Sequence, residues 1–180
     1  GAEWDYDARN PLRQVGVEEG DFLLAVNRVP LDLNYDPWAA LQNLAGKTIV
    51  LTVNKKPRSD KEERDVVVKA LSDDSTLRYR QWIEQNRKYV EEKSDGKVGY
   101  IYVPDTGTKG QNDLFRQFFG QIAKEALIID DRWNGGGQIP TRFIELLNRP
   151  VTNYWAKRDG LDMTWPSDAH HGPKCMLING

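Results

Sequence analysis

Three consecutive glycines after an apolar run are the residues of this chain best placed to take part in chemistry. The run 126–130 predicts a buried strand, and a polar turn after it leads into Gly135, Gly136 and Gly137. In α/β proteins, ligands bind beyond the carboxyl ends of parallel strands. Glycine tolerates positive φ, so its N–H groups can converge on a phosphate, a carboxylate or the oxyanion of acyl transfer. The glycines alone leave these ligands, and an ordinary glycine-rich loop, as alternatives.

Two nucleotide-binding alternatives fit this loop poorly. Dinucleotide binding needs a G-x-G-x-x-G run, whereas these glycines are adjacent, and no earlier strand supplies that motif. A nucleotide hydrolase would account for an apolar strand that ends in Asp130 and Asp131. The chain contains no G-x-x-x-x-G-K-[ST] loop to bind the phosphates, however, so this class is also disfavoured.

Other reactive side chains lack the partners that catalysis needs. His170 and His171 are expected to form a solvated loop pair rather than a base or a metal site. Cys175, the single cysteine, excludes an intrachain disulfide and a cysteine-cluster zinc site, and we expect a buried strand thiol. No serine lies in a glycine-flanked strand-to-helix elbow. The serines are Ser59, Ser72, Ser75, Ser94 and Ser167.

The composition indicates a globular protein. Hydrophobic residues make up 39% and charged residues 29% of the 180 residues, and the formal net charge is −2. Basic residues are scattered, so no basic stripe predicts nucleic-acid binding. No apolar run approaches the roughly 18 residues of a membrane span. Gly1 is not a natural start, so we expect that an upstream segment precedes it and that targeting cannot be deduced.

Residues 1–71 predict a small barrel-like or sandwich-like module of mostly antiparallel strands. Asp36 and Pro37 supply a helix start, and Gly46 lies where a helix commonly ends. A helix over 36–44 is therefore expected between short β-branched runs that turn residues separate. The expected strands are 22–26, 48–53 and 65–71.

Residues 72–96 predict a connector helix, and residues 97–180 predict an α/β domain. Ser72 or Asp74 could cap the connector. Beyond it, strands alternate with helices and one strand is apolar throughout, which favours a parallel sheet covered on both faces. The expected strands are 98–103, 126–130, 152–156 and one beginning at 175, and the expected helices are 112–124 and 139–147.

Four motifs together resemble the tricorn-type and tail-specific (C-terminal processing) serine peptidases. D-D-R-W-N-G-G-G at 130–137 is similar to the D-x-R-x-N-G-G-G signature of the tricorn branch. G-Y-I-Y at 99–102 matches a strand of that family, and 16–27 resembles the core of its PDZ-like domain. Residues 173–180 resemble the strand that leads to the nucleophile. All four motifs occur in the family's order.

The resemblance implies a two-domain chain of α+β and α/β class. The first domain would be a PDZ-like small β-barrel or sandwich with a helix, which binds peptides by strand addition between 22–26 and 36–44. The second would be part of a ClpP/crotonase-like α/β protease core. The implied parent is a homo-oligomeric serine-type peptidase that acts on peptides or unfolded polypeptides without cofactor or metal. It would be cytoplasmic if tricorn-like, and alternatively periplasmic or exported.

The resemblance also implies roles for residues of the glycine loop. In the family, one glycine amide of N-G-G-G helps to form the oxyanion hole, so the donor here is expected among Gly135, Gly136 and Gly137. Gly137 is favoured because it lies nearest the start of the following helix. Asp130 and Arg132 are expected to shape the loop by hydrogen bonds rather than to react.

The resemblance places the family's catalytic side chains outside this chain. Its histidine would precede Gly1 and its serine would follow Gly180, so we expect the 180 residues alone to be inactive. A non-catalytic PDZ-like peptide-binding scaffold is one alternative. An acyl-CoA enzyme of the enoyl-hydratase type is another, against which the PDZ-like module counts.

Overall fold

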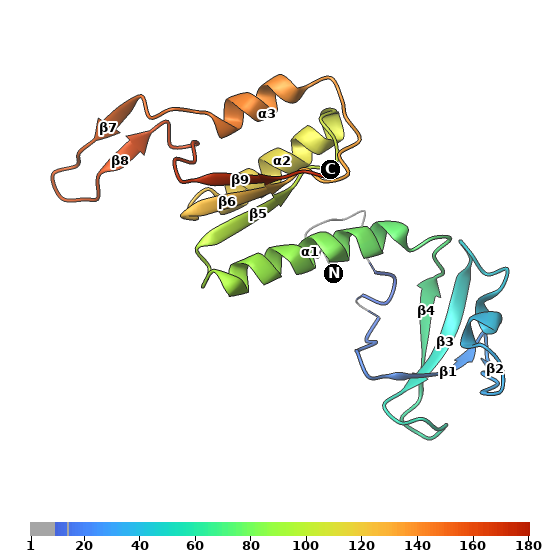
Figure 1. The fold of residues 1–180 in the computed structure, drawn as a ribbon. Coiled ribbons are helices and arrows are strands. Elements are labelled where there is room, and N and C mark those ends of the chain that lie inside the picture. Colours follow the sequence, from blue (N-terminus) through green and yellow to red (C-terminus); the bar gives the residue numbers. More distant parts are fainter. Residues whose placement is uncertain (1–9, 14) are drawn as a thin grey trace. The chain divides into compact units, whose positions relative to one another are not determined.

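A computed structural model describes residues 10–13 and 15–180 of the chain (Figure 1). The chain divides into two compact units, one ending at Trp82 and the other beginning at Ile83. Positions 1–9 and 14, which belong to the expected first domain, lie outside the described residues. Among the described residues, no helix combines the length and the apolar character that crossing a membrane requires.

The first unit contains a four-stranded antiparallel sheet in the order β2-β1-β3-β4. Successive side chains of β3 and β4 point to opposite faces of the sheet, so burial alternates along both strands and Ile49, Leu51 and Val53 are buried on one face. Three of the strands were predicted, whereas β2 is too short to produce a periodic pattern. The strands are β1 (Phe22–Val26), β2 (Val29–Pro30), β3 (Thr48–Asn54) and β4 (Arg64–Lys69).

The helix expected over 36–44 is a short 3-10 helix, η2 (Pro37–Leu41). Asp36 caps it as predicted, because its carboxylate accepts the N–H of Trp38 at 2.9 Å. Gln42 then adopts an extended ψ of 136° and Asn43 a left-handed φ of 61°, which ends the helical path before the predicted boundary. The prediction was therefore correct for the start of this element and wrong for its length.

The long helix α1 (Ser75–Lys93) crosses the division between the two units. Its side-chain cap is Asp73, whose carboxylate accepts the N–H of Ser75 at 3.0 Å. Asp74 instead pairs with Arg78 one turn further along, so neither of the predicted capping side chains performs that role. Beyond the helix, Asp95 and Gly96 turn the chain with positive φ.

The second unit contains a parallel three-stranded sheet in the order β5-β6-β9, as its apolar run predicted. Ile101, Leu127 and Ile129 from this sheet pack with Leu114 and Phe118 of helix α2 in one buried core. Figure 1 shows α2 and α3 beside the sheet, with β6 between its two neighbours. The elements are β5 (Val98–Tyr102), α2 (Thr108–Gln121), β6 (Ala126–Asp130), α3 (Pro140–Leu147) and β9 (Lys174–Leu177).

Between α3 and β9 the chain forms an antiparallel pair of strands, β7 (Asn153–Trp155) and β8 (Met163–Trp165). Only the first of these was predicted, and both are three residues long. Cys175 lies exposed on β9, an edge strand of the described sheet, so the expectation of a buried thiol was wrong.

Two glutamines of α2 hydrogen-bond the side of β5 that faces away from β6. The Gln121 amide accepts the N–H of Tyr100 and donates to the Tyr100 carbonyl, both at 2.8 Å. Gln117 makes the same pair with Tyr102, at 3.0 Å for each bond. Four helical residues advance about 6 Å and two strand residues about 6.6 Å, so the spacings match. Each side-chain amide replaces a peptide group of a neighbouring strand and protects this edge.

Replacing Gln121 with leucine removes both partners of the buried Tyr100 peptide at similar side-chain volume. We expect a loss of about 2 kcal/mol in unfolding free energy, because a buried donor and acceptor lose their hydrogen bonds. Hydrogen exchange of the β5 amides and urea unfolding measure the effect. Asn112→Leu, an exposed site on the same helix, is the matched control. Equal protection of the Tyr100 N–H in the two variants would contradict the edge-capping role.

Candidate active-site loop

The carboxylate of Asp130, at the end of β6, is fully buried and fully hydrogen-bonded. Arg132 donates Nε to Oδ1 at 2.8 Å and Nη2 to Oδ2 at 2.6 Å, and its backbone N–H also reaches Oδ1 at 3.1 Å. The Tyr100 hydroxyl donates to Oδ2 at 2.6 Å. A buried charge is tolerated when it is paired and hydrogen-bonded in this way. The contacts agree with the expectation that Asp130 and Arg132 shape the loop.

Burial and hydrogen bonding oppose one another at this carboxylate. Burial alone would raise the pKa of Asp130, but the hydrogen bonds from Arg132 and Tyr100 outweigh it, and the pKa lies below its ordinary value. Burial and the adjacent carboxylate raise the pKa of Tyr100, which therefore stays protonated and donates. The pair at Asp130 and Arg132 is thus ionised at neutral pH.

The turn after Asp130 is held at several points. Trp133 adopts φ 59°, its N–H donates to Asn179 Oδ1 at 2.9 Å, and its ring lies 5.2 Å from the Arg132 guanidinium carbon. Asn134 donates through Nδ2 to the Val103 carbonyl at 3.1 Å. The left-handed residue is therefore stabilised by contacts from distant parts of the chain rather than by its own preference.

The N–H groups of the first two glycines form hydrogen bonds within the protein. Gly135 donates its N–H to the carbonyl of Pro104 at 2.9 Å, and Gly136 donates to Asn134 Oδ1 at 2.6 Å. Thr106 then joins the loop to the segment after β5, because its N–H donates to the Gly136 carbonyl at 2.9 Å. These bonds connect the carboxyl ends of two neighbouring parallel strands.

Gly137 differs from the two glycines before it. Its φ is 150°, and a Cβ there would lie 2.3 Å from the carbonyl carbon of Thr106, so only glycine fits. Among the residues that the structure describes, its N–H has no hydrogen-bond partner, and the residue is exposed. Two residues further on, Ile139 donates to the Thr106 carbonyl at 2.9 Å and helix α3 begins. An exposed amide in a braced loop can donate to an anionic oxygen of a ligand.

The chain is similar to tricorn proteases in sequence. Residues 1–73 match the family described as tricorn protease PDZ domain. The tricorn protease of Thermoplasma volcanium is 30% identical over 168 residues, which is 93% of this chain and 16% of that protein. Tricorn protease homolog 1 of Streptomyces coelicolor is 36% identical over 177 residues, which is 97% of this chain and 16% of that protein.

The similarity extends to three dimensions. A crystal structure of the tricorn protease matches 99% of this chain with a TM-score of 0.85 and 29% sequence identity, and the match covers 17% of that chain. The predicted resemblance to tricorn proteases is confirmed. The tricorn-like chain spans about a sixth of the length of these relatives, 16 to 17% in each case.

Sequence reasoning missed the residues that brace the glycine loop of this tricorn-like chain. Pro104 and Thr106 follow β5 and hold the amide of Gly135 and the carbonyl of Gly136. A signal was available, because parallel strands that are neighbours bring their carboxyl ends to one edge of the sheet. The polar segment after 98–103 could therefore have been placed beside the glycines.

Three serines of the tricorn-like chain make structural contacts. Ser94 accepts the N–H of Val98 at 3.0 Å, while the hydroxyls of Ser75 and Ser59 bond to the acidic side chains of Asp73 and Glu63. In the part of the chain that the structure describes, no serine hydroxyl bonds to a histidine, and no group of three potential ligand side chains could hold a metal.

His170 is buried, so the expectation of a solvated pair was wrong for this residue and holds only for His171. Its Nε2 lies 2.8 Å from the Lys124 carbonyl, which can only accept, so Nε2 carries the proton. Nδ1 is buried and has no partner among the described residues. Burial therefore lowers the pKa of His170, and the nearby charge of Lys174 lowers it further. The neutral ring joins the start of β6 to the segment before β9.

Substituting Asp130 with asparagine leaves the Arg132 charge without its partner. We expect a loss of about 3 kcal/mol in unfolding free energy at pH 7, because breaking a buried pair leaves an uncompensated charge. The lowered pKa of Asp130 means that this stabilisation is lost as pH falls below the ordinary carboxyl range, so the difference should shrink in acid. Urea unfolding at both pH values tests this. Asp162→Asn, at an exposed position, should change the unfolding free energy little.

Lowering the pH from 7.5 to 5.5 should destabilise the chain through His170. Its pKa is below the ordinary value in the folded state, so the unfolded chain binds the proton more readily and stability falls as pH drops through about 6.5. His170→Gln, which can still donate to Lys124, should flatten this dependence. His171→Gln should retain it. The same slope in both variants would contradict a buried neutral His170.

Proposed function

We propose that this chain is part of a serine peptidase that hydrolyses peptides or unfolded polypeptides through an acyl-enzyme. The observation that carries the proposal is the N–H of the exposed residue Gly137, which has no hydrogen-bond partner among the described residues, whereas the N–H groups of Gly135 and Gly136 are satisfied within the protein. The similarity to tricorn proteases over nearly the whole chain supports it. Neither a cofactor nor a metal takes part in this chemistry.

In this proposal Gly135–Gly137 form the oxyanion-hole loop, and Gly137 is the donor. The amides of Gly135 and Gly136 keep the loop in shape by bonding inside the protein, so Gly137 is the one of the three glycines whose amide is available to the oxyanion. A donor that is positioned before the reaction stabilises the developing negative charge without reorganisation, and such a donor contributes about 10²–10³ in rate. Asp130 and Arg132 are positioning residues that hold the strand end from which the loop starts.

The nucleophilic serine and the histidine base belong, in this proposal, to parts of the longer protein outside these 180 residues. The serine hydroxyls that bond to acidic side chains or to the backbone are consistent with this, because none of them has a histidine as partner. The 180 residues alone are therefore expected to have no peptidase activity.

The first part of the chain has a separate role in this proposal. Residues 1–71 form a PDZ-like peptide-binding domain, 72–96 a connector helix, and 97–180 the partial catalytic core. β2 pairs with β1 at Ala25 and Val26, so a peptide strand would add beside the other end of β1, near the exposed Phe22. The parent is expected to assemble from identical subunits and to bind no nucleic acid.

Gly137→Ala in the full-length protein should lower kcat by at least 10², because the new Cβ displaces the loop from Thr106 and moves the donor. Peptide hydrolysis and labelling of the catalytic serine by a fluorophosphonate measure the effect. Gly135→Ala should cost less, since its Cβ has 3.8 Å to the nearest atom, the Pro104 carbonyl oxygen. Gly120→Ala, on an exposed part of α2 with open space around it, is the control for an added methyl group.

A different outcome would favour another function. If the full-length wild-type protein neither cleaves peptides nor reacts with the fluorophosphonate but still binds peptide, the non-catalytic scaffold is the correct description. Full activity of Gly137→Ala would instead leave the peptidase proposal intact and remove Gly137 as the donor.

A further inference from the structure

Trp133 has a backbone conformation that its own side chain does not favour. It is the one aromatic residue among the five described non-glycine residues with positive φ, and its φ is 59°. In an L-residue this conformation brings Cβ close to the following carbonyl oxygen, a strain that a short side chain such as asparagine offsets by bonding locally. Trp133 is 63% exposed, so burial of the ring offsets little of this strain. The left-handed turn therefore depends on partners elsewhere in the chain.

Asn179 supplies such a partner, in the register of the sheet. At the end of the ladder between β6 and β9, the N–H of Asp131 donates to the Leu177 carbonyl at 2.9 Å. Trp133 lies two residues after Asp131, and its N–H donates at 2.9 Å to Oδ1 of Asn179, two residues after Leu177. The Asn179 side chain thus takes the place of the next backbone carbonyl, beyond the end of β9 itself.

The turn at Trp133 determines where Asn134 lies. The N–H of Asn134 donates to the Asp131 carbonyl at 3.2 Å, and its Oδ1 accepts the N–H of Gly136 at 2.6 Å. Rotation of Trp133 out of the left-handed region would redirect every later residue of the loop, so both bonds would break. Gly137 would then lose its position, because it follows directly on the residue that Asn134 holds.

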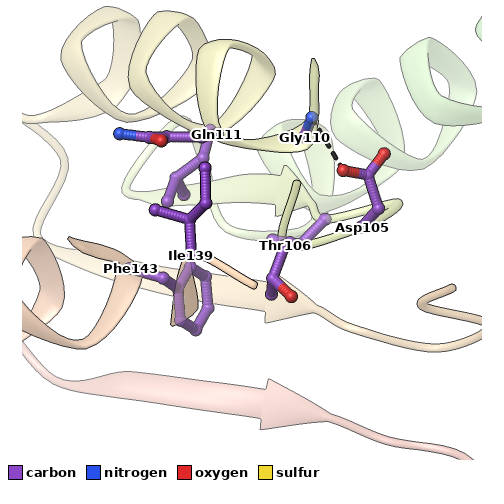
Figure 2. Close-up of a pocket in the computed structure, with 8 residues that line it drawn as sticks. Asp105, Thr106, Gly110, Gln111, Ile139 and Phe143 are labelled. Carbon is purple, nitrogen blue, oxygen red and sulfur yellow. Dashed lines mark hydrogen bonds between the residues drawn. The ribbon is translucent and has the colours of Figure 1, made fainter. Parts of the chain in front are cut away.

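The other end of the loop has a support of its own. The Thr106 carbonyl accepts the N–H of Ile139 at 2.9 Å, and both residues line the small pocket in Figure 2. The segment of Thr106 is fixed in turn to the start of α2, where Oδ1 of Asp105 accepts the N–H of Gly110 at 3.0 Å. The loop therefore spans two supports, and the one at Trp133 comes from the segment after β9.

We propose that Asn179 is a positioning residue for the Gly137 donor, and that the segment after β9 regulates the glycine loop through it. The inference rests on the proposed peptidase function and adds a means of control to it. While Asn179 accepts the Trp133 N–H, the turn stays left-handed and Gly137 keeps its place. When Asn179 moves away, Trp133 returns to a negative φ and the donor is displaced. One hydrogen bond and the strain of one left-handed residue are similar in free energy, so this bond can decide between the two states.

Hydrogen exchange in the full-length protein tests the bond without reference to catalysis. Asn179→Ala should speed exchange of the amides of 135–139 by about fivefold, because one hydrogen bond changes such an equilibrium by up to about tenfold. Asn179→Asp keeps an acceptor oxygen at the same place and should keep the wild-type rate. Asn112→Ala, the same change at an exposed position of α2, is the matched control. Faster exchange in both Asn179 variants, or in neither, would contradict the proposal.

Peptide hydrolysis measures the consequence for the donor. Asn179→Ala should lower kcat by about fivefold and change KM little, because the donor acts on the transition state. Trp133→Gly removes the strain, so adding Asn179→Ala to that variant should lower kcat by less than about twofold. Trp133→Ala also removes the ring but keeps the strained backbone, and in that variant the fivefold effect should remain.

The outcomes separate the role of Asn179 from the proposed function. An equal loss of kcat in the wild type and in both Trp133 variants would give Asn179 a general structural role and overturn the proposal. If Asn179→Ala does not fold, Asn179→Ser makes the same test, because its hydroxyl lies one bond short of the amide oxygen. If the exchange response appears but the wild type cleaves no peptide, the proposed function fails while the control of the loop by Asn179 stands.

Discussion

The buried carboxylate of Asp130 is the constraint on which the second unit depends. A strand that ends in a charged side chain inside the core is stable only if donors reach that charge, and Arg132 and Tyr100 supply them. Arg132 can do so only if the chain turns back immediately after β6. The turn then passes through the left-handed Trp133 and delivers the three glycines to the edge of the sheet. The direction of the loop thus follows from one electrostatic requirement.

In the same loop, some backbone N–H groups stabilise the fold while another has no partner within the described residues. The N–H groups of Gly135 and Gly136 donate to the Pro104 carbonyl and to Asn134 Oδ1, and these bonds stabilise the loop without a ligand. Gly137 is held in place through its backbone contact with Thr106, while its N–H remains exposed. A donor fixed by its neighbours costs little reorganisation when charge develops nearby, which is the property that an oxyanion hole requires. The proposed peptidase role uses this rigidity.

The local sequence pattern correctly predicted elements that are determined by residues close together in the sequence. The apolar run 126–130 became β6 with the predicted ends, because β-branched and apolar residues between turn residues determine such a strand. The helix predicted over 36–44 was too long, since the backbone leaves the helical region at Gln42 and Asn43. His170 and Cys175 were misassigned because burial depends on distant segments. Lys124 and Glu125 cover the segment of His170, and β9 lies at the edge of the described sheet.

The sequence by itself determined the type of site: an apolar strand, a charged turn and three glycines, in an order that matches tricorn proteases. Only the tertiary structure decided how the loop is held, because Pro104 accepts the amide of Gly135 and Thr106 donates to the carbonyl of Gly136, and both residues lie about thirty residues earlier in the chain. Parallel pairing of β5 with β6 brings those residues to the glycines. The partners of a backbone group across a parallel sheet are set by strand register, and no local pattern specifies that register.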